Sequence, residues 1–390
     1  MDRLQVIKAR KLYVGDGGAP LPDHAVVFRG AEILDVLPAA KAPQVAGGNE
    51  ASGIEAGGIA TDILVPGLVD LQLNGAGGRQ FNDDPTRDTL DCMAKAAQIG
   101  GTAWFLPTFI TDAGRSYQRA IAAVEAASPH CIGVIGLHLE GPFLSPVRPG
   151  IHPSAAIRKI DDADERLITE ASVRILLTLA PEETEMARLQ RLTASGVRLF
   201  AGHSEARYDT IVQAQKSGLR GATHLFNAMS QMANREPGLV GAVFDCPDLF
   251  AGIIADGIHV HPANLRSALA LAGPERLFLV SDAMMPLGTQ MTEFDLLGRR
   301  IHRKDGRLMS DAGVLAGADI SMIDAVRTLI RLTGCDLSTA IQMATQTPAR
   351  AIGLDHEIGT IEIGKRAGFT LLDQDLNVQS VLIGSSADHP

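Results

Sequence analysis

Cysteine, aromatic residues and long apolar runs are all scarce in this chain of 390 residues. The four cysteines lie far apart and form no CxxC pair, which excludes zinc ribbons and thioredoxin-like chemistry. So few cysteines in so long a chain are typical of a reducing compartment. Aromatic residues make up only 4%, whereas glycine occurs 40 times, a balance that suits an α/β protein with tight loops.

Other features that the sequence lacks exclude several classes of partner. No run of about 18 apolar residues occurs, so no transmembrane helix is predicted. The start, MDRLQVIKAR, has no apolar core of signal-peptide length. The net charge is −10, whereas a nucleic-acid-binding protein normally carries a basic face. We therefore expect a cytoplasmic protein that binds neither membranes nor nucleic acid. One local arginine and helix N-termini would still suffice to hold a single phosphate group.

The central part of the chain has the pattern of a parallel α/β fold. From Ile63 onward, short apolar runs alternate with helical stretches. Eight strands are predicted, at residues 68–74, 102–107, 134–140, 173–179, 197–203, 221–225, 249–256 and 277–282. Helical patterns lie between most of them, for example at 88–99, 115–126, 182–194 and 205–216. Eight strands joined by helices predict a closed (β/α)8 barrel.

The two ends of the chain predict a second, smaller unit. Residues 26–28 and 33–36 resemble paired strands, and residues 38–58 resemble a long hairpin loop. In the tail, residues 360–363 lie between two glycines and are predicted to form a tight strand pair. We therefore expect a small β-sandwich domain made of residues 1–62 and 355–390, with the barrel of residues 63–354 inserted between them.

The segment after the eighth strand is predicted to be less regular. A long glycine-rich loop is expected after Asp282. Helices are expected beyond it, at residues 320–332 and 337–344.

Polar side chains follow the predicted barrel strands where each strand ends. They are Gln72 and Asn74, His138 and Glu140, His203, His224, Asp256 and His259, and Asp282. A barrel enzyme assembles its active site from the C-terminal ends of several strands. These side chains are therefore expected to meet in one place.

Three of these residues have the composition of a catalytic zinc site. Glu140, His203 and His224 supply one carboxylate and two imidazoles, and a water molecule would be the fourth ligand. Such a site lowers the pKa of its water toward about 7. Asp282 could take the proton from that water and pass it to a departing amine. A lone histidine at a strand end is more often structural, but the shared end of one barrel favours the metal interpretation.

Eight motifs along the chain resemble those of one enzyme family. They are PGLVDLQLNGAGG (66–78), GLHLEGPF (136–143), AGHS (201–204), THLFNAM (223–229), REPG (235–238), ADGIHV (255–260), SDAM (281–284) and TPARAIGL (347–354). Together they resemble the N-acetylglucosamine-6-phosphate deacetylases of the amidohydrolase superfamily. One departure is Ser281, because the family usually has threonine before the aspartate of the eighth strand.

The resemblance implies roles for the residues at the matching positions. It implies that Glu140, His203 and His224 hold the metal and that Asp282 is the general base and acid. It also implies that His152 helps to polarise the acetamide carbonyl group. Without the resemblance, His152 would be interpreted as a loop residue.

The first strand bears on the number of metal ions. Many amidohydrolases carry His-X-His here and bind a second metal, whereas this chain has Gln72-Leu73-Asn74. Amide oxygens are poorer zinc ligands than imidazole nitrogens. We therefore expect one divalent metal per chain, with a weak second metal left open, and we expect Gln72 to bond the water or order the site. Zinc suits the donor set best, although Fe²⁺, Co²⁺ or Mn²⁺ would bind the same residues.

The resemblance also implies how a sugar phosphate would be held. The backbone N–H groups of Asn227 and Ala228 lie just past a strand end, where they can face an anion. Arg235 matches a family arginine that reaches the site of a neighbouring subunit, which implies a homodimer. His259 matches a family histidine that contacts sugar hydroxyls. Without the resemblance, Arg235 would be interpreted as a surface charge.

The function implied is hydrolysis of N-acetyl-D-glucosamine 6-phosphate to D-glucosamine 6-phosphate and acetate in amino-sugar catabolism. One alternative is the galacto epimer of the substrate or another N-acyl compound, because the sequence does not reveal which hydroxyl geometry is accepted. A cyclic-amide hydrolase would be favoured by His-X-His on the first strand, which is absent. A non-catalytic scaffold would be favoured by the loss of a metal ligand, and none is lost.

Overall fold

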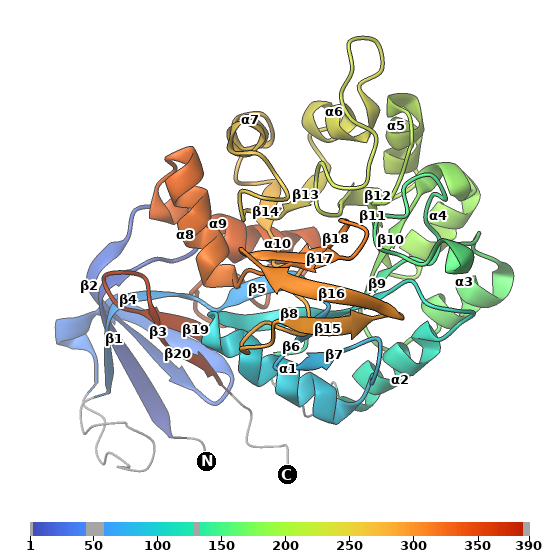
Figure 1. Ribbon diagram of the computed structural model, residues 1–390. Helices are drawn as coiled ribbons and strands as arrows, with labels where there is room; N and C mark the ends of the chain where they lie inside the picture. Colours follow the sequence, from blue (N-terminus) through green and yellow to red (C-terminus); the bar gives the residue numbers. More distant parts are fainter. Residues whose placement is uncertain (1–2, 44–57, 128–132, 385–390) are drawn as a thin grey trace.

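A computed structural model describes residues 3–43, 58–127 and 133–384. Its centre is an eight-stranded parallel sheet in the order β14-β13-β12-β11-β10-β9-β8-β5 (Figure 1). The strands are β5 (Leu68–Leu73), β8 (Thr102–Ile110), β9 (Leu137–Glu140), β10 (Ile175–Leu179), β11 (Arg198–Ala201), β12 (Leu219–Ala222), β13 (Phe250–Ile253) and β14 (Leu277–Leu279). Every predicted barrel strand is present, so the (β/α)8 prediction is confirmed.

The first and last strands of the barrel are joined just beyond their C-terminal ends. Leu73 and Ala283 form a parallel bridge, and the Asn74 N–H donates to the carbonyl oxygen of Ala283 at 2.9 Å. Below this bridge, the buried carboxylate of Asp70 accepts hydrogen bonds from the hydroxyl and the N–H of Ser281. The carboxylate therefore fixes the end of β14 against β5.

In the parts of the chain that the structure describes, helices pack around the barrel, seven of them between its strands (α1–α7) and three after its last strand (α8–α10) (Figure 1). They are α1 (Arg87–Ile99), α2 (Tyr117–Ala127), α3 (Asp162–Thr169), α4 (Met186–Ala194), α5 (Tyr208–Lys216), α6 (Gly238–Asp245), α7 (Pro262–Ala272), α8 (Met322–Thr333), α9 (Leu337–Ala344) and α10 (Gln346–Ala351). Helix α1 shows why they form, because Thr86 caps its first turn while Leu90 and Met93 are buried. Among the described residues, no helix has the length and apolarity needed to cross a membrane.

Both ends of the chain contribute to a separate mixed sheet. Its order is β20-β19-β4-β1-β2-β3, with β1 (Leu4–Leu12), β2 (Leu21–Arg29), β3 (Glu32–Pro38), β4 (Ile59–Pro66), β19 (Gly368–Leu372) and β20 (Val378–Ile383). The sheet folds back on itself, because Ile33 exchanges backbone hydrogen bonds with Lys365 and Gly364. It encloses a core that includes Phe28 and Phe369, whose rings lie 5.2 Å apart. The expected β unit from both termini is therefore present.

The boundary between the two units stays a prediction. Strand β4 belongs to the terminal sheet up to Pro66 and leads almost directly into barrel strand β5. The division at residue 62 thus lies within β4. Of the predicted hairpin loop at 38–58, residues 39–41 form a short 3-10 helix, and residues 44–57 lie outside the described part.

The predicted strand pair at 360–363 is wrong. Alternating Thr360-Ile361-Glu362-Ile363 has strand-like composition, but its backbone groups bond to different partners instead of one ladder. The Ile361 N–H donates to the carbonyl of Val14, and Lys365 closes a turn onto Glu362. Burial of Ile361 against the terminal sheet explains the apolar position without a strand.

The predicted glycine-rich loop after Asp282 is also wrong. Four antiparallel strands form a sheet there: β15 (Glu293–Leu296), β16 (Arg299–Lys304), β17 (Arg307–Ser310) and β18 (Leu315–Ala318). The glycines serve tight turns, because Leu297-Gly298 and Asp305-Gly306 all have positive φ, as two-residue hairpin turns require. We call β15–β18 the flap sheet. It packs on Ile110, Ile151 and Met284 and lies across the barrel (orange in Figure 1). The helices predicted beyond it are confirmed as α8 and α9.

Candidate active site

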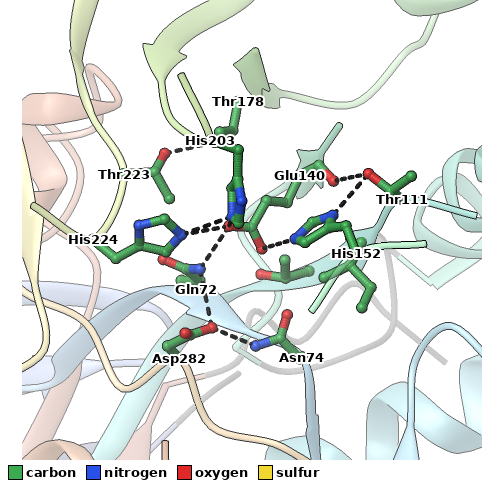
Figure 2. A network of polar contacts seen from close by, with 12 residues as sticks. Gln72, Asn74, Thr111, Glu140, His152, Thr178, His203, Thr223, His224 and Asp282 are labelled. Atoms are coloured by element: carbon green, nitrogen blue, oxygen red, sulfur yellow. Dashed lines mark hydrogen bonds and ion pairs between the residues drawn. The ribbon is translucent and has the colours of Figure 1, made fainter. Parts of the chain in front are cut away.

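Three side chains converge at the C-terminal end of the barrel. Glu140 is the last residue of β9, His203 follows β11, and His224 follows β12. Glu140 Oε1 lies 3.3 Å from His203 Nε2 and 2.9 Å from His224 Nε2, and the two Nε2 atoms are 3.1 Å apart (Figure 2). All three residues are buried. The predicted grouping is therefore present in the structure.

This arrangement fits a divalent metal ion. Donor atoms bound tetrahedrally at about 2.0–2.2 Å from one cation lie about 3.3 Å from one another. The three separations are close to this value, and each residue directs one donor atom to the shared point. Without a cation, the lone pairs of two imidazole nitrogens and a carboxylate oxygen would repel one another at these distances unless protons lay between them. The group is therefore a candidate site for a divalent cation.

The backbone directs the side chains after the strands into the barrel mouth. His203, His224 and Asp282 have φ values of 48°, 33° and 48°, a left-handed conformation that is rare for residues other than glycine. Such strain is retained mainly where the surroundings require it, often at functional sites. The barrel therefore turns sharply at three of the strand ends that bear these side chains.

The charge of the site favours an ionised carboxylate. Burial alone would raise the pKa of Glu140, but hydrogen bonds from His203 and His224 and the charges of neighbouring histidines hold that pKa well below its ordinary value.

His203 is oriented by its Nδ1, which lies 3.0 Å from the backbone carbonyl oxygen of Arg148 and leaves Nε2 for a cation. Within the residues that the structure describes, the buried Nδ1 of His224 has no hydrogen-bond partner.

Asp282 lies beside the three donors and is held by two amides. Its Oδ1 accepts hydrogen bonds from Gln72 Nε2 at 3.0 Å and Asn74 Nδ2 at 2.7 Å (Figure 2). Gln72 Nε2 is also 3.2 Å from Glu140 Oε1, so this amide connects the metal-type donors to Asp282. Burial and then the charge of Glu140 raise the pKa of Asp282 to about 7. A carboxyl group with this pKa can both accept and release a proton near neutral pH.

His152 faces the same centre from the loop after β9. Its Nε2 lies 4.0 Å from Glu140 Oε2, and its Nδ1 lies 2.8 Å from the hydroxyl oxygen of Thr111 (Figure 2). Burial and the charge of His203 lower the pKa of His152 well below its ordinary value. The ring is therefore neutral at physiological pH and points Nε2 into the site.

A pocket of about 500 Å³ opens above these groups. Most of the predicted site residues line it: Glu140, His152, His203, His224, Asn227, Ala228, His259 and Asp282. Gln72 does not line the pocket, but its amide donates to both Glu140 and Asp282, which do. The remaining walls are largely apolar and come from the end of β8, the flap sheet and neighbouring loops, including Ile110, Ile151, Met284, Val314 and Leu315. A small ligand with one polar end and one apolar group would fit such walls.

The predicted anion-binding backbone is only partly free. The Asn227 N–H already donates to the carbonyl oxygen of His224 at 3.0 Å. Ala228 has a φ of 47°, and none of the backbone hydrogen bonds in the described parts of the chain uses its N–H. Ala228 therefore offers an available donor at the pocket.

His259 and Arg235 lie in different environments. His259 lines the pocket, and its Nδ1 is 2.6 Å from the carboxylate of Asp256, which orients the ring. Arg235 is exposed in the loop before α6, which projects away from the barrel (Figure 1), and it does not line this pocket. Arg235 is therefore not part of this pocket within one chain.

Three contributions to the site were missed from the sequence. Two of them left no signal in the sequence, and the third left a signal that was not interpreted. Arg148 orients His203 through a backbone carbonyl, a group that every residue carries. Thr111 contacts His152 across 41 positions of sequence. The flap sheet had a usable signal, because Asp305-Gly306 between apolar alternation is a strong hairpin indicator.

Comparison with known proteins agrees with this fold. The model of the amidohydrolase family matches residues 63–387. The chain belongs to the amidohydrolase superfamily and is a metal-dependent hydrolase.

Individual relatives narrow the family further. An N-acetylgalactosamine-6-phosphate deacetylase of Shewanella sp. (strain ANA-3) is 42% identical over 83% of each chain. An N-acetylglucosamine-6-phosphate deacetylase of Haemophilus influenzae is 33% identical over 93% of this chain and 94% of its own. The crystal structure of that enzyme from Pasteurella multocida superposes with a TM-score of 0.91, with 33% identity over 98% of both chains. Within the superfamily, this chain belongs to the N-acetylglucosamine-6-phosphate deacetylase family.

Proposed function

We propose that this enzyme hydrolyses the acetamide of N-acetyl-D-glucosamine 6-phosphate to D-glucosamine 6-phosphate and acetate, in amino-sugar catabolism. The observation that carries the proposal is the buried group of Glu140, His203 and His224 with Asp282 beside it in one pocket. A relative from Mycobacterium smegmatis supports the substrate, since its variant was solved in complex with N-acetyl-D-glucosamine-6-phosphate, with 28% identity over 98% of this chain and a TM-score of 0.87.

The residues divide the chemistry between them. Glu140, His203 and His224 would hold one divalent cation, for which zinc is the best match, and a cation there supplies Lewis-acid activation of water and carbonyl oxygen. Asp282 takes the proton of the attacking water and passes it to the nitrogen of the departing amine. Gln72 keeps Asp282 next to Glu140 through its two hydrogen bonds.

His152 acts on the oxygen atom of the acetamide carbonyl group. Its Nε2 faces the centre, so a proton on that nitrogen can be donated to the acetamide oxygen as negative charge develops there. The burial that keeps the ring neutral also excludes water, which strengthens such a hydrogen bond.

The phosphate group would be held by donors from two chains. The Ala228 N–H and the Asn227 segment lie at the pocket, and Arg235 of a second copy would complete the site. We therefore propose a homodimer, with His259 contacting the sugar hydroxyls from within the same chain. A cytoplasmic location is part of the proposal and is consistent with the scarcity of cysteine.

N-Acetylgalactosamine 6-phosphate is a second candidate substrate. The observation that favours it is the 42% identity to the Shewanella enzyme, compared with 33% to the Haemophilus enzyme. The two sugars differ in the orientation of one hydroxyl group, so the same metal and proton chemistry would serve both.

The test is acetate release from four compounds: the two N-acetylhexosamine 6-phosphates and their unphosphorylated sugars. Metal content is measured on the same protein, and a chelator-treated sample with zinc added back serves as control. Release from the gluco phosphate at the highest kcat/KM supports the proposal, and faster release from the galacto phosphate would replace it with the second candidate. No release from any of the four by metal-loaded protein would reject both substrates.

A further inference from the structure

Thr111, directly after strand β8, lies in the active site without a role in the chemistry described above. Its side chain is buried between His152 and the backbone of Glu140. The hydroxyl oxygen is 2.8 Å from His152 Nδ1 and 3.2 Å from the carbonyl oxygen of Glu140 (Figure 2). The hydroxyl thus touches both a proposed carbonyl-polarising residue and a candidate metal ligand.

The local backbone leaves space for this contact. A Cβ atom on Gly141 would lie 2.2 Å from the Thr111 hydroxyl oxygen, which is far inside contact distance. Gly141 also has a φ of 88°, a conformation that other residues rarely adopt. Glycine at this position therefore allows the hydroxyl to reach His152.

The hydroxyl has one proton and two possible acceptors. If it donates to the Glu140 carbonyl, His152 must carry its proton on Nδ1, and its Nε2 faces the site as a bare acceptor. If it donates to His152 Nδ1, the neutral ring carries its proton on Nε2 and faces the site as a donor. Only the second tautomer can donate to an acetamide oxygen.

We infer that Thr111 is a positioning residue that donates to His152 Nδ1 and so places the ring proton on Nε2, facing the substrate carbonyl. This inference rests on the proposed function. Two observations support it. Among the described residues, the Thr111 hydroxyl is the group within hydrogen-bond distance of His152 Nδ1, so it is the group that can donate to that nitrogen when Nε2 carries the ring proton. The Nε2 atom faces the Glu140 carboxylate at 4.0 Å, a direction that favours an N–H over a lone pair.

The experiment compares Thr111→Val, which keeps the shape and loses the hydroxyl, with Thr111→Ser, which keeps the hydroxyl. For the valine variant we expect kcat to fall about tenfold or more, with KM and metal content within about twofold of the parent, because only a transition-state interaction is lost. The serine variant should recover most of the lost kcat. Equal losses in both variants, or loss of metal in the valine variant, would overturn the inference.

A double-mutant cycle with His152→Gln tests whether Thr111 acts through His152. If it does, adding Thr111→Val to His152→Gln should cost no further activity. Additive losses would mean that Thr111 acts by another route and would refute the assignment.

The tautomer can also be read without turnover, which separates this inference from the proposed substrate. The ¹⁵N shifts of labelled histidines in the metal-loaded protein distinguish a protonated Nδ1 from a protonated Nε2, and His152→Gln identifies the signal. The parent should show the proton on Nε2, and Thr111→Val should show a mixture. A parent ring protonated on Nδ1 would overturn the inference even if acetate is released, whereas failure of every substrate would leave this measurement intact.

Discussion

Asn74 and Asp282 face each other across the closure of the barrel, joined by a 2.7 Å hydrogen bond from the amide Nδ2 to the carboxylate Oδ1. The first residue lies at the end of the first barrel strand, and the second lies at the end of the last. The contact that closes the barrel thus also holds the carboxylate that we propose transfers the proton.

Removal of this hydrogen bond should change the pH dependence of turnover. Because the Asn74 amide stabilises the ionised form, it lowers the pKa of Asp282, and Asn74→Ala should raise that pKa. A net hydrogen bond of about 1 kcal/mol corresponds to a shift of about 0.7 units. The acidic limb of the kcat profile should move upward by about that amount, so activity falls more at pH 6 than at pH 8. Asn82→Ala, another buried asparagine that bonds the Ile110 backbone, is the control and should leave the limb in place.

Asp282→Asn should bind metal normally and lose most of its turnover. The amide keeps the size of the carboxylate but cannot accept a proton from water, and general acid–base groups typically contribute about 100- to 10,000-fold. Single-turnover acetate release and metal content are measured on the same sample. Turnover within a few-fold of the parent would contradict the proton-transfer role.

Ser281 should stabilise the fold through its hydroxyl, not through its size. Ser281→Ala removes a hydrogen bond to the buried carboxylate of Asp70, and bonds to charged groups are worth about 1.5–3 kcal/mol. We expect a loss of that order in the free energy of unfolding by denaturant. Ser281→Thr keeps the hydroxyl and should be within about 1 kcal/mol of the parent. A stable alanine variant would show that Asp70 does not need this partner.

Arg235 should act on the site of another subunit. Arg235→Ala should raise KM for the phosphorylated substrate and leave the unphosphorylated sugar unaffected, because the guanidinium pairs with phosphate oxygens. The sharper test mixes Arg235→Ala with Asp282→Asn after dissociation and reassociation. In a hybrid dimer one site has both an intact Asp282 and an arginine from its neighbour, so activity should exceed that of either variant alone. Mixtures no more active than their parts would refute action between subunits.

The sequence predicted the barrel and the convergence of its strand-end residues because both follow from local rules. Apolar runs spaced by helical patterns define parallel strands, and parallel strands in a barrel bring their C-terminal ends together. Glu140, His203 and Asp282 could therefore be grouped although they lie far apart in the chain. The grouping needed no detail of side-chain packing.

The contacts around His152 could not be predicted in the same way. They depend on how the loop after β9 folds back on β8, which is set by tertiary packing instead of periodicity. The backbone carbonyl of Arg148 carries no side-chain signal at all. Segment 360–363 shows the opposite error, since a strand-like alternation there reflects the burial of Ile361 and not a ladder.

The pairing of β4 with β19 has a consequence for synthesis on the ribosome. Pro66 lies opposite Phe369, so the hydrogen-bonding edge of β4 must wait for a partner made about 300 residues later. At about 5–20 residues per second, the nascent chain holds that edge uncovered for roughly 15–60 s. During this interval the apolar strand Ile59–Pro66 is open to pairing with other chains. Slower translation or a truncated message should therefore increase aggregation of the nascent chain through this strand.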